Sequence, residues 1–309
     1  MTNDYLIVGA GLTGLTVAHD LTKHFSDRKI QILEKSKGCG GRMATRRIDD
    51  LRFDHGAQFI KKSITSQRWI QIWKNAEVDQ RFPAELIDGI CGQSGLTQLA
   101  KVLAKDLNIK YDIKVSSISF TNGYWAVRAE DDSTVQGKNI IMTCPLPQSL
   151  ELLQSSGLTF NSELSQIKYS KAVVVLIESD VSLLQLNPNY EENISADVFS
   201  ACSQQAKGNT KTPAWTVVMS APWSELNFDL SDGLLLEKAC EVIRQQRPNI
   251  TIKKAHLKKW KYCAPLSTWS KLFENPAPGL YLAGDSFGGP SLLGALRSSQ
   301  ELFNCLKVK

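Results

Sequence analysis

Residues 4–34 contain the feature that most restricts the fold of this chain. The uninterrupted apolar run YLIVG is typical of a strand that is buried on both faces in a parallel sheet. It leads directly into the glycines of VGAGLTG, and the next segment, LTGLTVAHDLTKHF, carries apolar residues at helical spacing. A second strand, KIQILEK, completes a strand–helix–strand unit. The chain is therefore expected to begin with the βαβ unit of a nucleotide-binding domain.

The glycine spacing and the acid that follows it predict a dinucleotide site. Gly9, Gly11 and Gly14 form GxGxxG between the strand and the helix. In this pattern the first glycine allows a tight turn, the second lets the backbone approach a pyrophosphate, and the third lets helix and strand pack closely. Glu34 ends the second strand about twenty residues after the last glycine, where an acid accepts the ribose hydroxyls. The helix N-terminus adds free N–H groups for the phosphates.

The composition excludes several other classes of protein. The net charge of +5 is too small to argue for nucleic-acid binding. Arg42, Arg46 and Arg47 form a basic cluster, but no aromatic residues interleave it, so we predict no nucleic-acid partner. The seven cysteines are scattered, with no CxxC pair and no Cys/His cluster. We therefore predict neither a metal site nor a redox disulfide.

The cysteines and the apolar runs also indicate the cellular compartment of the protein. Scattered cysteines that form no framework are typical of a reduced, cytosolic protein. The N-terminus has no basic and apolar regions of the kind found in signal peptides. The longest purely aliphatic run, residues 173–177, is far shorter than the ~20 residues that cross a bilayer. We predict a cytoplasmic protein without a membrane partner.

The pattern along the chain predicts two domains, one inserted into the other, as expected for 309 residues at about 150 per domain. The strands before residue 148 and the final strand GLYLAGD share the α/β style, whereas KAVVVLIES, AWTVVMSA and KKAHLKKWKYC indicate a more antiparallel sheet. The polar segment 187–211 is expected to be a long surface loop. We predict a Rossmann-like α/β domain and an inserted mixed or antiparallel α+β substrate domain. Their predicted bounds are residues 1–62, 90–148 and 272–309 for the first, and residues 63–89 and 149–271 for the second.

The segment KSKGCGGRMATRR, which begins just after Glu34, indicates which dinucleotide is bound. GxGxxG, Glu34 and then Gly40-Gly41-Arg42 resemble the FAD signature of the flavin-containing amine oxidase superfamily, in which a second glycine loop closes over the diphosphate. Two glycines permit a close backbone approach, and an arginine adds charge-assisted hydrogen bonds to phosphate. A plain nicotinamide dehydrogenase has no need of this second loop.

Two further segments resemble the same superfamily. FDHGAQF, residues 53–59, resembles the stretch that runs beside the flavin ring, where its Gly-Ala pair leaves room for the ring. GLYLAGDSFGGPSLLGALRSSQ, residues 279–300, resembles the C-terminal FAD motif. In that motif the acid, Asp285, holds the ribityl chain, and the following helix directs its N-terminus at the pyrimidine edge of the ring. The positive end of that helix dipole would stabilise negative charge on a reduced flavin.

The resemblance implies non-covalent FAD, held by residues from several segments. Val115 fits the position whose backbone meets the adenine, and His55 lies where it could contact the ring. The residues expected to bind the cofactor are Gly9, Ala10, Gly11, Leu12, Thr13, Gly14, Glu34, Lys35, Gly40, Gly41, Arg42, His55, Gly56, Ala57, Gln58, Val115, Gly284, Asp285, Ser291, Leu292 and Leu293.

Within this superfamily the chain resembles the renalase family. The points of likeness are KSKGCGGRMATRR followed by FDHGAQF, the PLPQSLELL segment, APWS at residues 221–224 and KKWKYCAP at residues 258–265. They are spread over nearly the whole chain. The resemblance implies an FAD-dependent oxidase of mis-reduced isomers of β-NAD(P)H, which restores NAD(P)+ by hydride transfer to flavin N5. O2 would then reoxidise the flavin and give H2O2.

Two alternatives stay open on the residues alone. The superfamily label makes a small amine the rival substrate, and an amine cation would favour an aromatic cage or carboxylates, whereas phosphates would favour a basic pocket. The inserted domain is rich in both Trp and Lys, so the sequence does not decide between them. The other alternative is a non-catalytic FAD-binding protein, against which the intact ring-side segment argues. No second GxGxxG is present for a separate NADPH domain, so the reduced substrate itself is expected to deliver the hydride.

The substrate-facing residues are predicted on the strand before the last FAD motif. The resemblance indicates Tyr262 and Trp260 of KKWKYCAP as pocket residues. His256, on the same strand, is a candidate proton shuttle because histidine titrates near neutrality. Arg46 and Arg47 are left open between the entry to a pocket for a phosphate-bearing substrate and an ordinary solvated surface.

Overall fold

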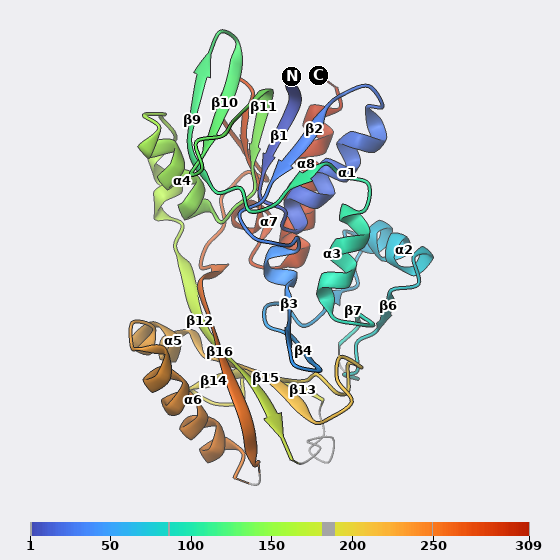
Figure 1. Ribbon diagram of the computed structural model, residues 1–309, viewed down its shortest axis with the longest axis vertical. Helices are drawn as coiled ribbons and strands as arrows, with labels where there is room; N and C mark the ends of the chain where they lie inside the picture. The colour runs from blue at the N-terminus through green and yellow to red at the C-terminus, as the bar shows by residue number, and fades with distance from the viewer. Residues whose placement is uncertain (1, 86, 181–188, 249, 309) are drawn as a thin grey trace. The chain divides into compact units, whose positions relative to one another are not determined.

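The computed structural model describes residues 2–85, 87–180, 189–248 and 250–308 (Figure 1). The chain forms two compact units, and each is assembled from segments that are distant in the sequence. Unit 1 comprises Met1–Gly41, Ala100–Lys168 and Ala264–Lys309, and unit 2 comprises Arg42–Leu99 and Tyr169–Cys263.

Unit 1 is built on a mainly parallel sheet. The central strand β1 (Asn3–Val8) pairs in parallel with β2 (Ile30–Leu33) on one side and with β11 (Thr134–Met142) on the other. Leu6 and Ile7 are fully buried, which explains why the YLIVG run shows no polar alternation. The path through the sheet runs β17–β18–β11–β1–β2–β8. The remaining strands of that path are β8 (Ile109–Lys110), β17 (Glu274–Ala277) and β18 (Leu280–Leu282).

The helices of unit 1 bring the two ends of the chain together. Helix α1 (Leu12–His24) packs against α8 (Leu292–Leu306), and Figure 1 shows the two helices side by side. The Thr13 hydroxyl donates a hydrogen bond to the Ala295 carbonyl at 3.4 Å. Because α1 belongs to the first glycine motif and α8 to the last, this packing joins the two ends of the predicted cofactor domain. The other helical segments are α4 (Leu146–Ser155), η2 (Ser162–Gln166) and α7 (Asp285–Gly288).

A β-hairpin extends the sheet of unit 1 at β11. Strands β9 (Val115–Thr121) and β10 (Tyr124–Ala129) are antiparallel, and β10 pairs with the first half of β11. Asn122 and Gly123 connect them with φ of 54° and 79°. Two positive φ values are what the Asn-Gly pair predicts for a tight hairpin turn, so this prediction is confirmed.

Unit 2 contains a five-stranded sheet whose order is β13–β14–β15–β12–β16. Each of the pairs β13–β14, β14–β15 and β15–β12 is antiparallel. This confirms the prediction of a more antiparallel sheet in this part of the chain. The strands are β12 (Tyr169–Ser179), β13 (Tyr190–Glu192), β14 (Val198–Ser203), β15 (Ala214–Met219) and β16 (Ile252–Pro265).

This sheet is covered on both faces. Val173, Val175 and Ile177 of β12 point to one face and pack with apolar residues of α6 (Asp232–Gln246). The alternate residues of β12 pack with Phe53 of β4 (Leu51–Asp54) on the opposite face. Burial of both faces explains the uninterrupted apolar run in KAVVVLIES.

Smaller elements complete unit 2. The β3–β4 hairpin ends at Asp54, immediately before the predicted ring-side segment. A three-stranded sheet has the order β5–β7–β6. The elements of unit 2 are β3 (Thr45–Ile48), β4 (Leu51–Asp54), β5 (Ile60–Lys61), α2 (Gln67–Asn75), β6 (Asp79–Arg81), β7 (Gly89–Gly92) and α5 (Ala221–Asn227). Two further elements, η1 (Gly41–Met43) and α3 (Leu96–Ala104), contain residues of both units.

The prediction of a long surface loop over residues 187–211 is wrong. Residues 187 and 188 lie outside the described residues, but β13 and β14 both fall within the remainder. Lys207, in the same segment, is fully buried. The two strands are only three and six residues long and lie within a segment rich in Ser, Gln and Asn, so their pattern is weak, and pairing of β14 with β13 and β15 supplies the order.

The two units do not test the predicted domain bounds. Contacts group residues 42–62 and 90–99 with unit 2, whereas the prediction assigns them to the FAD-binding domain. Contact density does not decide which residues serve the cofactor, so the predicted assignment stays a prediction.

Every helix in the described part of the chain falls short of the length and apolar character that crossing a bilayer would require. The predicted cytoplasmic location stays a prediction.

Candidate functional site

The first glycine loop of unit 1 has the geometry that its sequence predicts. Gly9 has φ of 107°, which side chains disfavour. A Cβ at Gly14 would lie 2.0 Å from the Gly9 carbonyl oxygen, so only glycine lets α1 begin this close to β1. A Cβ at Gly11 would meet nothing within 4 Å, which leaves open space beside the backbone at the N-terminus of the helix. That space suits a ligand phosphate that approaches the backbone closely.

The predicted ribose-binding acid is joined to the same loop. Glu34 is buried, and its carboxylate accepts hydrogen bonds from the N–H groups of Ala10 at 2.7 Å and Ser36 at 2.8 Å. These bonds fix the carboxylate beside the glycine turn. Each carboxylate oxygen has a second lone pair, so the group can still accept from a sugar hydroxyl.

We expect Glu34→Ala to weaken FAD binding by about 10-fold or more, since loss of a hydrogen bond to a charged group costs about 1.5–3 kcal/mol. Titration of the apoprotein with FAD, followed by quenching of flavin fluorescence, measures this change. Glu130→Ala is the control because this exposed residue of unit 1 forms a surface salt bridge with Lys114. Equal affinities for wild type and the Glu34 variant would exclude the proposed role.

The second glycine loop lies beside the first. The Gly40 N–H donates to the Ala10 carbonyl at 2.8 Å, and Gly11 and Gly40 form a parallel bridge. Gly40 and Gly41 have φ of 114° and 53°. Two glycine backbones in contact form a surface without side chains, as a diphosphate needs for a close approach. The structure therefore brings together the two loops that the sequence predicts to hold the phosphates.

Arg42 is the first residue of unit 2, and its guanidinium donates to the Cys263 carbonyl at 2.8 Å. Its carbonyl accepts the Ala57 N–H at 2.9 Å. The predicted contact between Arg42 and the diphosphate stays a prediction.

The C-terminal motif of unit 1 also relies on glycine. Gly284 has φ of 151°, and its N–H donates to the Ser298 hydroxyl at 2.9 Å. Asp285 follows and is buried at the start of α7. Ser291 caps α8 by accepting the Gly294 N–H at 3.2 Å, so Leu292 and Leu293 form its first turn. The positive end of the α8 dipole therefore lies at the predicted flavin-binding residues.

Lys35 and Val115, two further predicted cofactor-binding residues of unit 1, both lie near Glu34. Lys35 is exposed and follows Glu34 directly. The Ile113 N–H donates to the Glu34 carbonyl at 2.9 Å, and Val115 begins β9 two residues later. Leu12 and Thr13 are buried in the first turn of α1.

Unit 2 holds the predicted ring-side loop, His55–Gln58, between β4 and β5. A Cβ at Gly56 would lie 2.1 Å from the Arg42 carbonyl oxygen, so the immediate reason for glycine here is the Arg42 backbone. The Gln58 side chain donates to the Asp54 carbonyl at 2.7 Å and closes the loop on itself. The expected proximity of Gly56 and Ala57 to the flavin stays a prediction.

His55 and Trp260 form a pair within unit 2. Their rings are stacked, with centroids 5.4 Å apart and planes at 22°, and the Trp260 indole N–H donates to the His55 carbonyl at 2.7 Å. Burial lowers the pKa of His55 to about 4, with the cations Lys258 and Arg46 adding to the effect and Asp54 opposing it. The imidazole is therefore neutral near pH 7. Its Nδ1 is buried and has no hydrogen-bond partner among the described residues.

The other substrate candidates lie on the same strand as Trp260. Tyr262 packs edge-to-face on Tyr169 with ring centroids 6.0 Å apart. His256 is half-buried, and its Nε2 also has no hydrogen-bond partner within the described ranges. Alternation along β16 places His256, Trp260 and Tyr262 on one face. Their predicted roles stay predictions, although Trp260 and His55 are brought into direct contact.

The same face of β16 is basic. The Lys258 ammonium lies 5.2 Å from the centroid of the Trp260 ring, and the Arg46 guanidinium donates to the Leu257 carbonyl at 3.3 Å. Arg47, the neighbour of Arg46 on β3, is exposed. Lys207, which the sequence analysis does not identify, is buried against Asp54 and Gln58.

A parallel sheet that leads into a glycine loop, an anchored acid and a second glycine loop define a dinucleotide-binding protein of the flavoprotein type. Residues 7–76 match the family model described as an NAD(P)-binding Rossmann-like domain, and residues 61–301 match that of the flavin containing amine oxidoreductases. The second match covers more than half of the chain, so the chain belongs to the flavin containing amine oxidoreductase family.

Known structures have the same fold. The chain superposes on a protein named as a protoporphyrinogen oxidase from Exiguobacterium sp. 255-15 with a TM-score of 0.83 and 14% identity, over 100% of this chain and 99% of the other. It superposes on wild-type putrescine oxidase bound to putrescine with a TM-score of 0.76 and 11% identity, over 100% of both chains. These likenesses confirm the predicted fold class.

A curated relative matches part of the chain. It is named as the FAD-containing monooxygenase MymA of Mycobacterium tuberculosis, and it is 27% identical over 143 residues. The match covers 46% of this chain and only 26% of that protein, so the chain spans about a quarter of its length.

Family membership confirms FAD as the cofactor and places the chain among FAD-dependent oxidoreductases. The residues present fit this cofactor. Within unit 1, Gly11 has open space for a phosphate, and Gly11 and Gly40 form a backbone surface without side chains.

Proposed function

We propose that this protein is a renalase-like oxidase, which oxidises mis-reduced isomers of β-NAD(P)H to NAD(P)+. The observation that supports this proposal most directly is the pairing of a neutral, stacked His55–Trp260 couple with the cations Lys258 and Arg46. Flat aromatic surfaces suit a dihydronicotinamide ring. The neighbouring positive charge suits the phosphates of a dinucleotide.

The same charges argue against an amine as the substrate. An amine cation would be repelled by Lys258 and Arg46, and both cations already act against protonation of His55. The carboxylate next to His55 in the chain is Asp54, which is paired with Lys207. A solved member of the fold binds putrescine, so the amine alternative is retained as an outcome of the experiment below.

The residues of the protein would bind the cofactor and orient the substrate. The two glycine loops and Glu34 would hold the diphosphate and ribose, and Asp285 with the α8 N-terminus would hold the ribityl chain and the ring. Trp260 and His55 would orient the substrate, and the unpartnered Nδ1 of His55 is available to hydrogen-bond a ligand without carrying charge. When bound, FAD supplies the hydride acceptor, and O2 is the proposed oxidant of the reduced flavin. No general base is required of the protein for a hydride transfer.

A substrate test separates the two alternatives. The purified holoenzyme is mixed anaerobically with β-NADH preparations that contain the isomers, and separately with small amines, while flavin absorbance is recorded. We expect bleaching with the dinucleotide and stoichiometric H2O2 after O2 is admitted. Bleaching by amines alone would overturn the proposal.

We expect Lys258→Gln to raise KM for the dihydronicotinamide dinucleotide about 10-fold with little change in kcat, because a charge contact made equally in ground and transition states affects binding only. Steady-state kinetics at low and high salt measures this effect, which should shrink as salt screens the wild-type charge. Lys259→Gln is the matched control, since Lys259 lies on the opposite face of β16 and bonds the Leu230 carbonyl. An unchanged KM in Lys258→Gln would remove the charge argument.

A further inference from the structure

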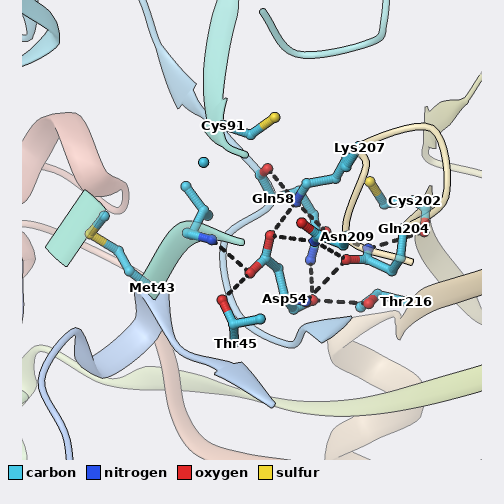
Figure 2. Close-up of polar contacts among 12 residues, drawn as sticks. Met43, Thr45, Asp54, Gln58, Cys91, Cys202, Gln204, Lys207, Asn209 and Thr216 are labelled. Carbon is cyan, nitrogen blue, oxygen red and sulfur yellow. Dashed lines mark hydrogen bonds and ion pairs between the residues drawn. The ribbon is translucent and has the colours of Figure 1, made fainter. Parts of the chain in front are cut away.

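Unit 2 contains a fully buried ion pair at the base of the ring-side loop (Figure 2). Lys207 and Asp54 both have 0% exposed side chains. The Lys207 ammonium donates to Asp54 Oδ2 at 2.5 Å, to the Gln58 carbonyl at 2.8 Å and to Gln58 Oε1 at 3.3 Å. Its three N–H groups therefore have three acceptors, so none is left over for a ligand.

The ammonium joins the two ends of one loop. Asp54 precedes His55–Gln58 and Gln58 ends it, so Lys207 holds both ends from a segment about 150 residues away in the sequence. The Gln80 side chain donates to the Lys207 carbonyl and holds the lysine backbone in turn. This arrangement fixes the span of the loop that carries His55.

Asp54 is held from every side. Its Oδ1 accepts the Leu96 N–H at 2.8 Å and the Thr45 hydroxyl at 2.5 Å, and its Oδ2 also accepts from Asn209 at 3.1 Å. The Thr216 hydroxyl donates to the Asp54 carbonyl at 2.9 Å. The position of the carboxylate is thus fixed, and Figure 2 shows Thr45, Lys207 and Asn209 around it.

Stability alone does not explain the ion pair. Buried ion pairs rarely stabilise a fold more than apolar side chains of the same volume, because desolvation offsets the attraction. An apolar side chain at position 207 could fill the space but could not bond the carbonyl and the side chain of Gln58. The lysine therefore serves to hold the His55–Gln58 loop in position.

Lys207 is also unsuited to direct chemistry. Burial acts to lower its pKa, but the Asp54 carboxylate outweighs this effect and raises the pKa, so the ammonium stays charged. A charged amine with every N–H engaged is neither a nucleophile nor a base.

We propose that Lys207 is a positioning residue for the oxidation: it holds both ends of the His55–Gln58 loop in the geometry that the flavin and substrate require and touches neither of them. The proposal rests on the proposed function in one respect, namely that this loop serves the flavin ring. It predicts that loss of the ammonium alters the chemistry more than it alters retention of FAD.

The test uses the FAD-loaded Lys207→Met variant. We expect hydrogen exchange of the loop peptide to quicken, the visible spectrum and midpoint potential of the bound flavin to shift, and the anaerobic rate of flavin reduction to fall about 10- to 100-fold with a smaller change in substrate Kd. Ile177→Ala is the control, because this buried β12 residue packs on the opposite, α6 face. It should lower Tm without changing the spectrum, the potential or the rate. Values for Lys207→Met that match this control would overturn the proposal.

A double variant covers the case in which Lys207→Met fails to fold. Asp54→Asn combined with Lys207→Met removes both charges, so stability should return while the rate and the potential stay altered. Recovery of the rate together with stability would overturn the proposal.

Rates are measured with whichever compound reduces the wild-type flavin. An amine in that role would reject the proposed substrate class and leave the Lys207 comparison intact. A wild-type loop that exchanges as fast as the Lys207→Met loop would reject the positioning role and leave the substrate result intact.

Discussion

Gly14→Ala is expected to abolish FAD retention and to destabilise the protein by about 3 kcal/mol or more, near the upper end for overpacking a well-filled site. The added Cβ would lie 2.0 Å from the Gly9 carbonyl oxygen and 2.8 Å from the Thr143 hydroxyl. The first of these atoms is backbone, so α1 itself would have to move away from β1. Chemical denaturation and the flavin-to-protein absorbance ratio of the purified protein measure the two effects.

Gly11→Ala, three residues earlier, should behave differently. Its Cβ would meet nothing within 4 Å, and Gly11 has φ of −74°, which alanine adopts readily. Stability should therefore change by no more than about 0.5 kcal/mol. FAD affinity should still fall about 10-fold or more, because the methyl group would occupy the space proposed for the pyrophosphate. Gly38→Ala is the control, because Gly38 is exposed and a Cβ there would also meet nothing within 4 Å. It should change neither stability nor FAD affinity. Unchanged FAD affinity in Gly11→Ala would place the phosphates elsewhere.

The glycine loops could be predicted because their geometry is determined locally. Gly9, Gly40 and Gly284 all have positive φ, and each occurs in a motif whose spacing already requires such a backbone. The buried βαβ run and the Asn122-Gly123 turn are equally local signals. The backbone conformations that these local patterns predict are therefore present in the structure.

Lys207 could not be predicted for the opposite reason. Its partner Asp54 lies 153 residues earlier, and the surrounding sequence SQQAKGN has the composition of a solvated loop. A lysine is almost never fully buried unless it is paired, and nothing in the sequence identifies the pair. Likewise the basic surroundings of His55 depend on the register of β16, which brings Lys258 and Trp260 to the same face. Contacts of this kind are set by tertiary packing.

The neutral state of His55 predicts a specific sensitivity to acid. Burial, Lys258 and Arg46 lower its pKa from 6.5 to about 4, and Asp54 only partly opposes them. The folded state therefore takes up this proton less readily than the unfolded state does. Its contribution to stability is fully present above about pH 6.5 and is lost as the pH falls through about 4. The complete loss corresponds to about 3 kcal/mol, of which about 2 kcal/mol is reached near pH 5.

His55→Phe removes this titration and keeps a ring against Trp260. We expect the free energy of unfolding of the wild type to fall by about 2 kcal/mol more than that of the variant between about pH 7.5 and pH 5. Urea denaturation of both proteins at saturating FAD measures the difference, and taking it between two pH values cancels any change in cofactor affinity that does not depend on pH. His24→Gln, at the exposed end of α1, controls for the removal of a histidine as such. Parallel pH dependences for wild type and His55→Phe would mean that the imidazole can charge within the fold. The proposed substrate site would then lose its neutral imidazole, because burial is the largest cause of the lowered pKa of His55.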